Sequence, residues 1–445
     1  MALGDVIMTD TDGNIGVKRT VTSEEVSGLL FDISAQKTGF WESTPGTAAS
    51  AKFKDTVVEL NSLPDAVEAG IAEYSDLTAD TAKDYLLNGV AYYHIKHYFN
   101  RVGGTGRLFV MFADCSTNFN ALIDMQKAAN GMISQFGVWT EQSLWKAAAG
   151  GDEMYQNNTL KTDLNTIANT LANEYSAPCV IALCANSAKV KTSAGTQDTV
   201  EISKIPTVIS KDRYVGVLLS QARESTVATI QRSLDSKTPV GTLGCVLGAL
   251  ASDNVAESIG WVQNGNVVDY FPDIEMGFGD VSVESSELKN TTPYHALTRS
   301  QLNALEDKGY IFLCKYAGLE GSVYFSGDTT CSDGDYRSFS RNRVINKSRR
   351  NVRAALLPYV NAKLKLDPST GALSTAQITI FTNAVSDVLT AMESAEEISG
   401  MGTINIPANQ NILQNDKLRL SYKIVPMGTS KEIIVEEGLA LNSQA

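Results

Sequence analysis

Residues 80–112 read DTAKDYLLNGVAYYHIKHYFNRVGGTGRLFVMF, and this stretch contains the pattern that determines the fold class. Its first part, Asp80–Phe99, is rich in aromatic residues and predicts a helix. The glycine-rich segment Gly103–Gly106 ends that helix, and the continuous apolar run Leu108–Phe112 predicts a strand. Uninterrupted apolar strands next to amphipathic helices indicate a sheet that is covered on both faces.

Similar segments follow further along the chain. Apolar residues at spacings of four, three and four predict one stripe on a helix: Leu160, Leu164, Ile167 and Leu171. Two further apolar runs predict buried strands, Cys179–Leu183 and Tyr214–Leu219. We therefore predict an α/β fold, with an α/β body over residues 21–330.

Three helices are predicted by local signals. Thr298 with Gln301, and Ser374 with Gln377, match the capping box that begins a helix. The helix after Ser374 carries a full apolar repeat: Ile378, Phe381, Val385, Val388 and Met392. In the third, the apolar segment Gly241–Ala251, two glycines four residues apart predict close packing of a buried helix: Gly244 and Gly248.

Both ends of the chain predict extended, β-prone arms. Near the N-terminus, four apolar residues flank the turn-forming pair Asp12–Gly13: Val6, Ile7, Ile15 and Val17. Thr403–Ile406 predicts a short strand, and period-two alternation predicts a half-buried strand with Leu418, Leu420, Tyr422 and Ile424. Lys431–Val435, with Ile433 and Val435, predicts a final strand. We divide the chain into an N-terminal arm (1–20), the body (21–330), a C-terminal inner domain (331–425) and a C-terminal arm (426–445).

Composition excludes several classes of protein. The chain has 445 residues, of which 43% are hydrophobic and 20% charged, which is ordinary for a globular protein. Its net charge of −13 disfavours general binding to nucleic acid or to anionic membranes. No apolar run approaches the ~18 residues that would span a bilayer, and the start MALGDVIMTD lacks the features of a signal peptide. The cysteines are scattered and predict free thiols from a reducing compartment: Cys115, Cys179, Cys184, Cys245, Cys314 and Cys331.

The sequence contains no convincing catalytic, metal-binding or cofactor-binding pattern. His94 and His97 could share one helix face, but no HExxH motif or closely spaced cysteine pair accompanies them. Gly103–Gly106 precedes a strand, whereas a phosphate-binding loop follows one. The aspartates after Thr9 fail as an EF-hand because Val21 stands where a glutamate is required. We expect no enzyme activity, metal or cofactor.

A run of basic residues departs most from average composition. Between Tyr336 and Leu366 there are nine basic residues and no acidic one: Arg337, Arg341, Arg343, Lys347, Arg349, Arg350, Arg353, Lys363 and Lys365. On a helix, Val344, Ser348, Val352 and Leu356 form one stripe, and Arg343, Lys347 and Arg350 lie on another face, flanked by Arg349 and Arg353. A solvated basic face is one interpretation. Because like charges at these spacings repel, we prefer an acidic partner surface, either in this chain or in another.

The C-terminal third resembles the tail sheath proteins of contractile injection systems, which include contractile phage tails, R-type bacteriocins and type VI secretion systems. The resemblance rests on GSVYFSGDTT at residues 321–330, followed by Gly334–Arg337 and the arginine-rich helix. The closing segment Lys417–Pro426, and Val240–Gly260 with Trp261 after it, also fit. One departure is that the Gly-x-Arg-Thr of many sheaths reads Gly-Asp-Thr-Thr here, at residues 327–330.

The resemblance implies a sheath-type α/β body whose extended arms add strands to neighbouring copies. Such subunits form stacked six-fold rings around an inner tube, and their contraction drives the tube into a target membrane. The implied partners are further copies of the chain, the inner tube protein, and baseplate and tail terminator proteins, without direct nucleic-acid binding or stable membrane insertion. The implied location is a virion tail sheath or the bacterial cytoplasm.

The resemblance also implies a role for the basic helix. We expect Arg343, Lys347 and Arg350, with Arg349 and Arg353 beside them, to bind an acidic strip of the inner tube. Two alternatives stay open at this point: a non-contractile structural or adhesion protein, and a soluble α/β enzyme of unrecognised type.

Overall fold

The computed structural model describes most of the chain. The described residues are 23–34, 54–71, 73, 89–140, 142, 144–147, 155–157, 159–185, 205–219, 221, 241–272, 274–276, 292–294, 297–319, 321–368, 371–407, 410, 412 and 417–438. The predicted N-terminal arm, with Val6, Ile7, Ile15 and Val17, lies outside them, as do residues 80–88 of the first predicted helix.

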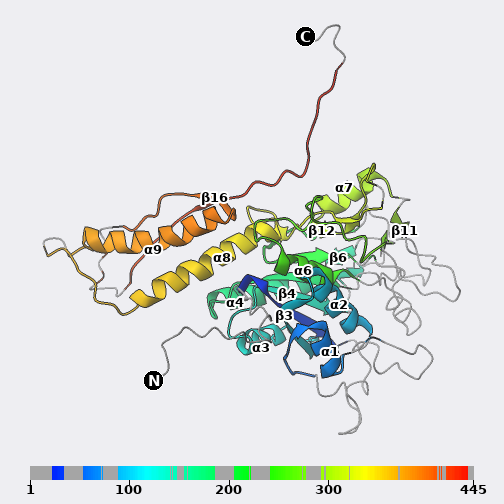
Figure 1. Cartoon of the computed structure of the whole chain (residues 1–445), viewed down its shortest axis with the longest axis horizontal. Coiled ribbons are helices and arrows are strands. Elements are labelled where there is room, and N and C mark those ends of the chain that lie inside the picture. The colour runs from blue at the N-terminus through cyan, green and yellow to red at the C-terminus, as the bar shows by residue number, and fades with distance from the viewer. Residues whose placement is uncertain are drawn as a thin grey trace, which may run out of the picture.

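A seven-stranded sheet forms the centre of the body (Figure 1). Its strands, in order across the sheet, are β12 (Tyr310–Ile311), β9 (Val215–Leu218), β7 (Val180–Ala185), β4 (Gln135–Thr140), β1 (Val26–Asp32), β3 (Thr105–Ala113) and β2 (Val58–Ser62). All neighbouring pairs are parallel except β2, which runs antiparallel to β3. The structure thus confirms the α/β class and the three predicted apolar strands.

Helices cover both faces of this sheet, because the strands bury side chains on both sides. One core combines Phe31 and Trp139 with side chains of α1 (Leu63–Ala69), α2 (Tyr92–Arg101) and α6 (Leu243–Ser252). The opposite core combines Leu30 and Phe136 with α3 (Ala121–Ala128), α4 (Leu160–Asn173) and α7 (Arg299–Asp307). The predicted α4 stripe is confirmed, since its three leucines are buried and Ile167 packs beside them.

Helices α2 and α6 approach each other closely through glycines. A Cβ added to Gly244 would lie 1.9 Å from the carbonyl oxygen of His94, and one added to Gly248 would lie 2.9 Å from that of Tyr98. Only glycine permits this contact, so the predicted close packing of this helix is confirmed. Gly103 and Gly104 have φ of 81° and 96°, which explains why α2 ends just before them.

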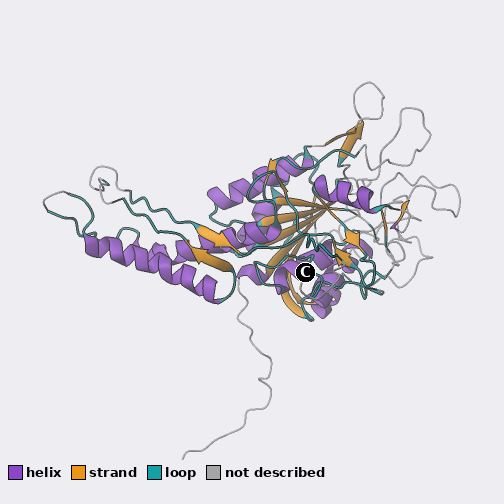
Figure 2. Cartoon of the chain, turned by 90° about the horizontal axis from the view of Figure 1, so that it is seen from above, coloured by secondary structure: helices purple, strands orange, loops and turns teal. Residues whose placement is uncertain are grey.

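Two long helices extend from the body as a helical hairpin in both views (Figures 1 and 2). Helix α8 (Phe339–Leu356) begins against the sheet, where Gly216 of β9 leaves room for the Phe339 ring. A short turn, η6 (Leu357–Tyr359), and a loop lead to α9 (Thr375–Ser394), which packs back along α8. The Thr298 capping box is present at α7, and the Ser374 hydroxyl caps α9 by accepting a hydrogen bond from the Gln377 backbone N–H.

Short strand pairs complete the described structure. They are β5 (Trp145–Ala147) with β6 (Tyr155–Asn157), β8 (Lys211–Asp212) with β15 (Cys331–Ser332), β10 (Glu275–Met276) with β11 (Thr292–Pro293), β13 (Leu313–Cys314) with β14 (Tyr324–Phe325), and β16 (Ile398–Met401) with β17 (Ile424–Pro426). A 3-10 turn, η1 (Ser23–Glu25), immediately precedes β1.

The predicted strand Thr403–Ile406 is wrong in position. The regular strand is β16, and further along only Asn405 forms an isolated bridge, with Ser421. The alternation over 418–424 is confirmed as a burial pattern, although only its end belongs to β17. Lys431–Val435, predicted as a final strand, is not paired with any described strand.

Candidate assembly surfaces

Helix α8 contains most of the basic run, and the fold places its apolar stripe inward. Val344, Ser348 and Val352 are buried and Leu356 is half-buried, as the spacing predicts. The Ser338 hydroxyl accepts a hydrogen bond from the Arg341 backbone N–H and thereby starts the helix.

Arg343 lies inside the chain and not on its surface. The side chain is 3% exposed and donates hydrogen bonds to the backbone carbonyls of Leu250, Asp253 (3.1 Å) and Asn254 (3.3 Å) at the end of α6. Carbonyls at a helix C-terminus have no partner within the helix and attract a cation. Burial lowers the pKa of Arg343 to about 10, so the guanidinium stays charged at neutral pH. The expectation that Arg343 faces another protein is therefore wrong.

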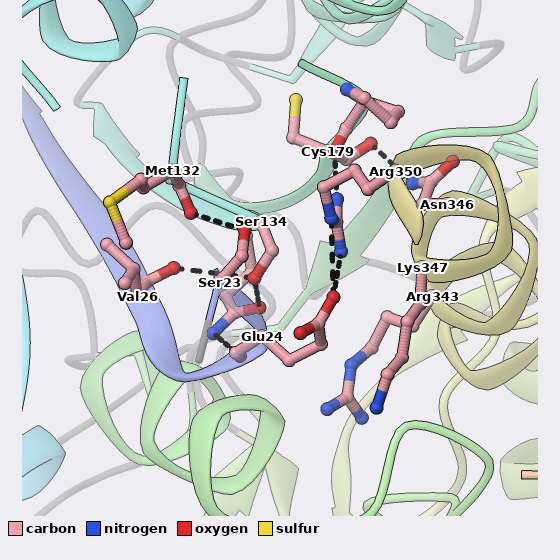
Figure 3. Close-up of polar contacts among 12 residues, drawn as sticks. Ser23, Glu24, Val26, Met132, Ser134, Cys179, Arg343, Asn346, Lys347 and Arg350 are labelled. Carbon is pink, nitrogen blue, oxygen red and sulfur yellow. Dashed lines mark hydrogen bonds and ion pairs between the residues drawn. The ribbon is translucent and has the colours of Figure 1, made fainter. Parts of the chain in front are cut away.

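Arg350 binds an acidic residue from the far end of the chain, as Figure 3 shows. Its guanidinium lies 2.7 Å from Glu24 Oε1 and also donates to the carbonyl of Pro178 at 2.6 Å. Both side chains of the pair are 13% exposed. Burial acts to raise the pKa of Glu24, but the charge of Arg350 and its hydrogen bond outweigh burial and hold that pKa below its ordinary value.

Two further basic residues of α8 also have partners within the chain. Lys347 forms an ion pair with Glu397, whose side chain is 7% exposed, and Arg349 donates to the carbonyl of Ala172 at 3.4 Å. Asn346, next to them, donates to the carbonyl of Cys179 at 3.3 Å. The body-proximal half of the basic helix is thus held by Glu24, Glu397 and backbone carbonyls of the same chain.

At the far end of the helical hairpin, the basic side chains are exposed. Arg353, Lys363 and Lys365, which we call the tip cations, are exposed, and no ion pair joins them to any described residue. Two apolar side chains are exposed in the same region, Leu357 at 46% and Val360 at 64%. Of the five residues expected to bind a tube, only Arg353 is therefore exposed on this surface.

The C-terminal part of the chain separates into a packed and an exposed section. Four expected arm residues pack half-buried against α8 and α9 of their own chain: Leu418, Leu420, Tyr422 and Ile424. Tyr422 Oη also forms a 2.9 Å hydrogen bond with Ser348 Oγ. Beyond them, residues 427–438, here called the C-terminal segment, are exposed throughout. Within it Ile433, Ile434 and Val435 are 81%, 80% and 78% exposed, so an apolar stretch that pairs with no described strand faces solvent.

The histidine pair has the environment of a core contact. His94 accepts a 3.3 Å hydrogen bond from the Gly244 backbone N–H at Nδ1, and His97 stacks on Phe271. Burial lowers the pKa of His94 to about 3 and that of His97 to about 4. Within the described part of the chain, no three His, Cys, Asp or Glu residues group as metal ligands, and no helix there is long and apolar enough to cross a bilayer.

The acidic partners of the basic helix have no signal in the sequence. Glu24 and Arg350 are 326 residues apart in the chain, and neither periodicity nor a motif links them. The sequence did indicate that the basic run needs an acidic surface, and the structure supplies part of that surface from within the chain.

Family models match nearly the whole chain. Residues 3–329 match the model described as DUF2586, N-terminal domain, and residues 335–444 match DUF2586, C-terminal domain. No curated protein sequence matches the chain.

Solved structures similar to this chain come from contractile injection systems. A chain of the 6-fold symmetrised baseplate of the anti-feeding prophage shares 14% identity over 99% of each chain, with a TM-score of 0.54. A chain of the helical sheath of that prophage in the contracted state shares 12% identity over 98% of this chain and 99% of its own, with a TM-score of 0.52. A chain of the PVC sheath complex in the contracted state shares 10% identity over 99% and 98%, with a TM-score of 0.54. At these identities the similarity shows the fold, and it confirms the sheath resemblance at that level.

Proposed function

The chain belongs to the DUF2586 family, and from that premise and its fold we propose that it is a sheath subunit of a contractile injection system. The observation that carries this proposal is the extent of the fold similarity. It covers 98–99% of this chain and of the contracted sheath chains, and so includes the body, the helical hairpin and the C-terminal segment. A similarity confined to the α/β body would be compatible with many functions.

In this proposal the subunits form stacked six-fold rings around an inner tube, and contraction of the stack drives the tube into a target membrane. The exposed Ile433–Val435 stretch supports the arm assignment, since an unpaired apolar strand gains main-chain hydrogen bonds by joining a sheet of another copy. Baseplate and tail terminator proteins would bind the two ends of the stack. Assembly would take place in the bacterial cytoplasm, and the finished sheath would be part of the particle.

We place the contact with the inner tube at the tip of the helical hairpin. Lys347 and Arg350 would have to give up Glu397 and Glu24 before they could bind another protein. The tip cations need no such exchange, and they lie next to exposed apolar residues that can be buried on binding. Each exposed ion pair contributes only about 0–1 kcal/mol, but repetition along a sheath makes the sum large. We expect docking to weaken with salt as charges are screened.

A triple variant tests this docking surface. Arg353→Glu, Lys363→Glu and Lys365→Glu together should leave the subunit folded and prevent it from coating inner tubes at low salt. Arg337→Glu is a matched control, since Arg337 is also exposed but lies before α8 at the body. Normal coating by the triple variant, with loss of coating by the control, would place the tube contact elsewhere.

Electron microscopy of the purified protein tests the sheath function itself. We expect rings or tubes with six-fold symmetry, alone or when an inner tube protein is co-expressed. We also expect no hydrolysis of nucleotide, ester or glycoside substrates, because the matched structures belong to structural assemblies. Discrete particles under all conditions, or a turnover that a point substitution in this chain abolishes, would contradict the proposal.

A further inference from the structure

The C-terminal segment contacts the body through Lys431. Lys431 forms an ion pair with Glu306 of α7, and its Nζ also donates a hydrogen bond to Thr329 Oγ1 at 3.1 Å. Thr329 in turn donates its hydroxyl to Glu306 Oε1 at 3.2 Å. The three groups therefore contact one another, with Glu306 Oε1 accepting hydrogen bonds from both Lys431 and Thr329.

The body side of this contact is preformed. Thr329 is 1% exposed and the Glu306 side chain is 24% exposed, so both are held by the body, whereas the Lys431 side chain is 58% exposed. Gly327 borders the site, and a Cβ there would lie 3.3 Å from both Glu306 Oε1 and Lys431 Nζ. Glu306 Oε2 is buried without a hydrogen-bond partner, which leaves the carboxylate dependent on a nearby cation. We call Glu306, Gly327 and Thr329 the lysine notch.

The lysine notch lies where the C-terminal segment leaves the molecule. Figure 1 shows the segment running from beside β16 towards α7 and then away from the body. The exposed apolar stretch Ile433–Val435 begins two residues after Lys431. Holding Lys431 therefore determines the point from which that stretch projects.

We propose that Lys431, bound in the lysine notch of its own chain, is a positioning residue that presents Ile433–Val435 to a second copy. The presentation of Ile433–Val435 to a second copy rests on the proposed sheath function. The contact between Lys431 and the lysine notch does not. A free segment has to be ordered when it joins another sheet, and that ordering opposes association. Fixing the segment at Lys431 removes part of this cost before association. Because the pair is partly exposed, salt weakens it.

The contact is tested first on unassembled subunits by spin labelling. All six native cysteines are buried, so Gly438→Cys supplies a selective label site at the exposed end of the segment. Glu306→Lys or Lys431→Glu should increase label mobility, and the double variant should restore the mobility of the parent. Lys423→Glu, an exposed lysine of the preceding strand region, has the same charge change and should have no effect. Equal mobility in all variants would overturn the proposal.

The effect of the Lys431 contact on assembly is tested by measuring the critical concentration for polymerisation. Each single charge reversal should raise it up to about fivefold, as expected for one exposed ion pair, and the double variant should return it to the parent value. An equimolar mixture of the two single variants should not return to the parent critical concentration, because in the mixture an oppositely charged pair at these two positions can form only between copies. Recovery in the mixture equal to that of the double variant would show that the notch receives Lys431 from another copy and would overturn the assignment within one chain.

The two tests separate this inference from the sheath function. If the parent chain forms no polymer, the sheath function fails, while the spin-label comparison still decides whether Lys431 holds the segment.

Discussion

Arg343 and Arg353 belong to the same helix and the same basic run, yet their environments are opposite. Arg343 is buried and bonded to three backbone carbonyls of residues 250–254, whereas Arg353 is exposed near the tip of the helical hairpin. A buried guanidinium is tolerated only when acceptors surround it. The first arginine thus joins α8 to α6, and the second is free to contact another molecule.

We expect Arg343→Met to lower the free energy of unfolding by about 3 kcal/mol, because it leaves several buried carbonyls without donors. Arg353→Met should change it by less than about 0.5 kcal/mol, as is usual for exposed positions. Urea unfolding of the unassembled subunit, followed by circular dichroism, measures both. Similar losses for the two variants would mean that the carbonyl contacts of Arg343 contribute little.

At the scale of single elements, the start of α9 depends on one hydroxyl. Ser374 Oγ accepts a hydrogen bond from the Gln377 backbone N–H, which would otherwise lack a partner. We expect Ser374→Ala to lower the free energy of unfolding by about 1 kcal/mol. Ser394→Ala, at the exposed end of the same helix, should have almost no effect. Thermal unfolding of the two variants side by side makes the comparison, and equal midpoints would contradict the capping role.

The packing of α2 against α6 should make stability depend on pH. Burial lowers the pKa of His97 to about 4 and that of His94 to about 3, against an ordinary value of 6.5. Between these pKa values and pH 6.5, the histidines are protonated in the unfolded chain and neutral in the folded chain. The free energy of unfolding is therefore highest above pH 6.5 and falls as the pH drops towards 4. The decrease in the free energy of unfolding approaches about 1.4 kcal/mol per pH unit for each histidine.

Urea unfolding at pH 7, 6 and 5 measures this slope. We expect His97→Phe to reduce it by about half over this range, because the new ring can stack on Phe271 as the imidazole does and cannot take a proton. An unchanged slope in the variant would show that other groups cause the acid sensitivity.

At the scale of the whole molecule, the exposed C-terminal segment should serve assembly and contribute little to folding. Deletion of Lys431–Ala445 removes no described side chain that is buried, so the free energy of unfolding should change by less than about 1 kcal/mol. Polymerisation should fail, because the strand offered to a second copy is lost. Circular dichroism and electron microscopy of the same preparation give both results. Full-length tubes from the truncated chain would rule out this segment as an arm, and an unfolded product would assign it to the core.

The sequence by itself determined the α/β class and much of its local detail. Apolar runs located β3, β7 and β9, the spacing of leucines located α4, and Thr298 and Ser374 marked two helix starts. These features are local, because strand burial, helix periodicity and capping each depend on residues within a few positions of one another. The alternation over 418–424 could be predicted for the same reason. It did not show that these residues pack against α8 and α9 of the same chain.

Only the tertiary structure decided which basic residues are free. Arg343, Lys347 and Arg350 share one helix face in the sequence pattern, but their partners come from α6, from Glu397 and from Glu24. Likewise, the Lys431 contact with Glu306 joins residues 125 positions apart. A sequence pattern reports which side of a helix is polar or charged. It does not report which distant segment the fold packs against that side. The identity of that segment determines whether a charged side chain is paired within the chain or can bind another molecule.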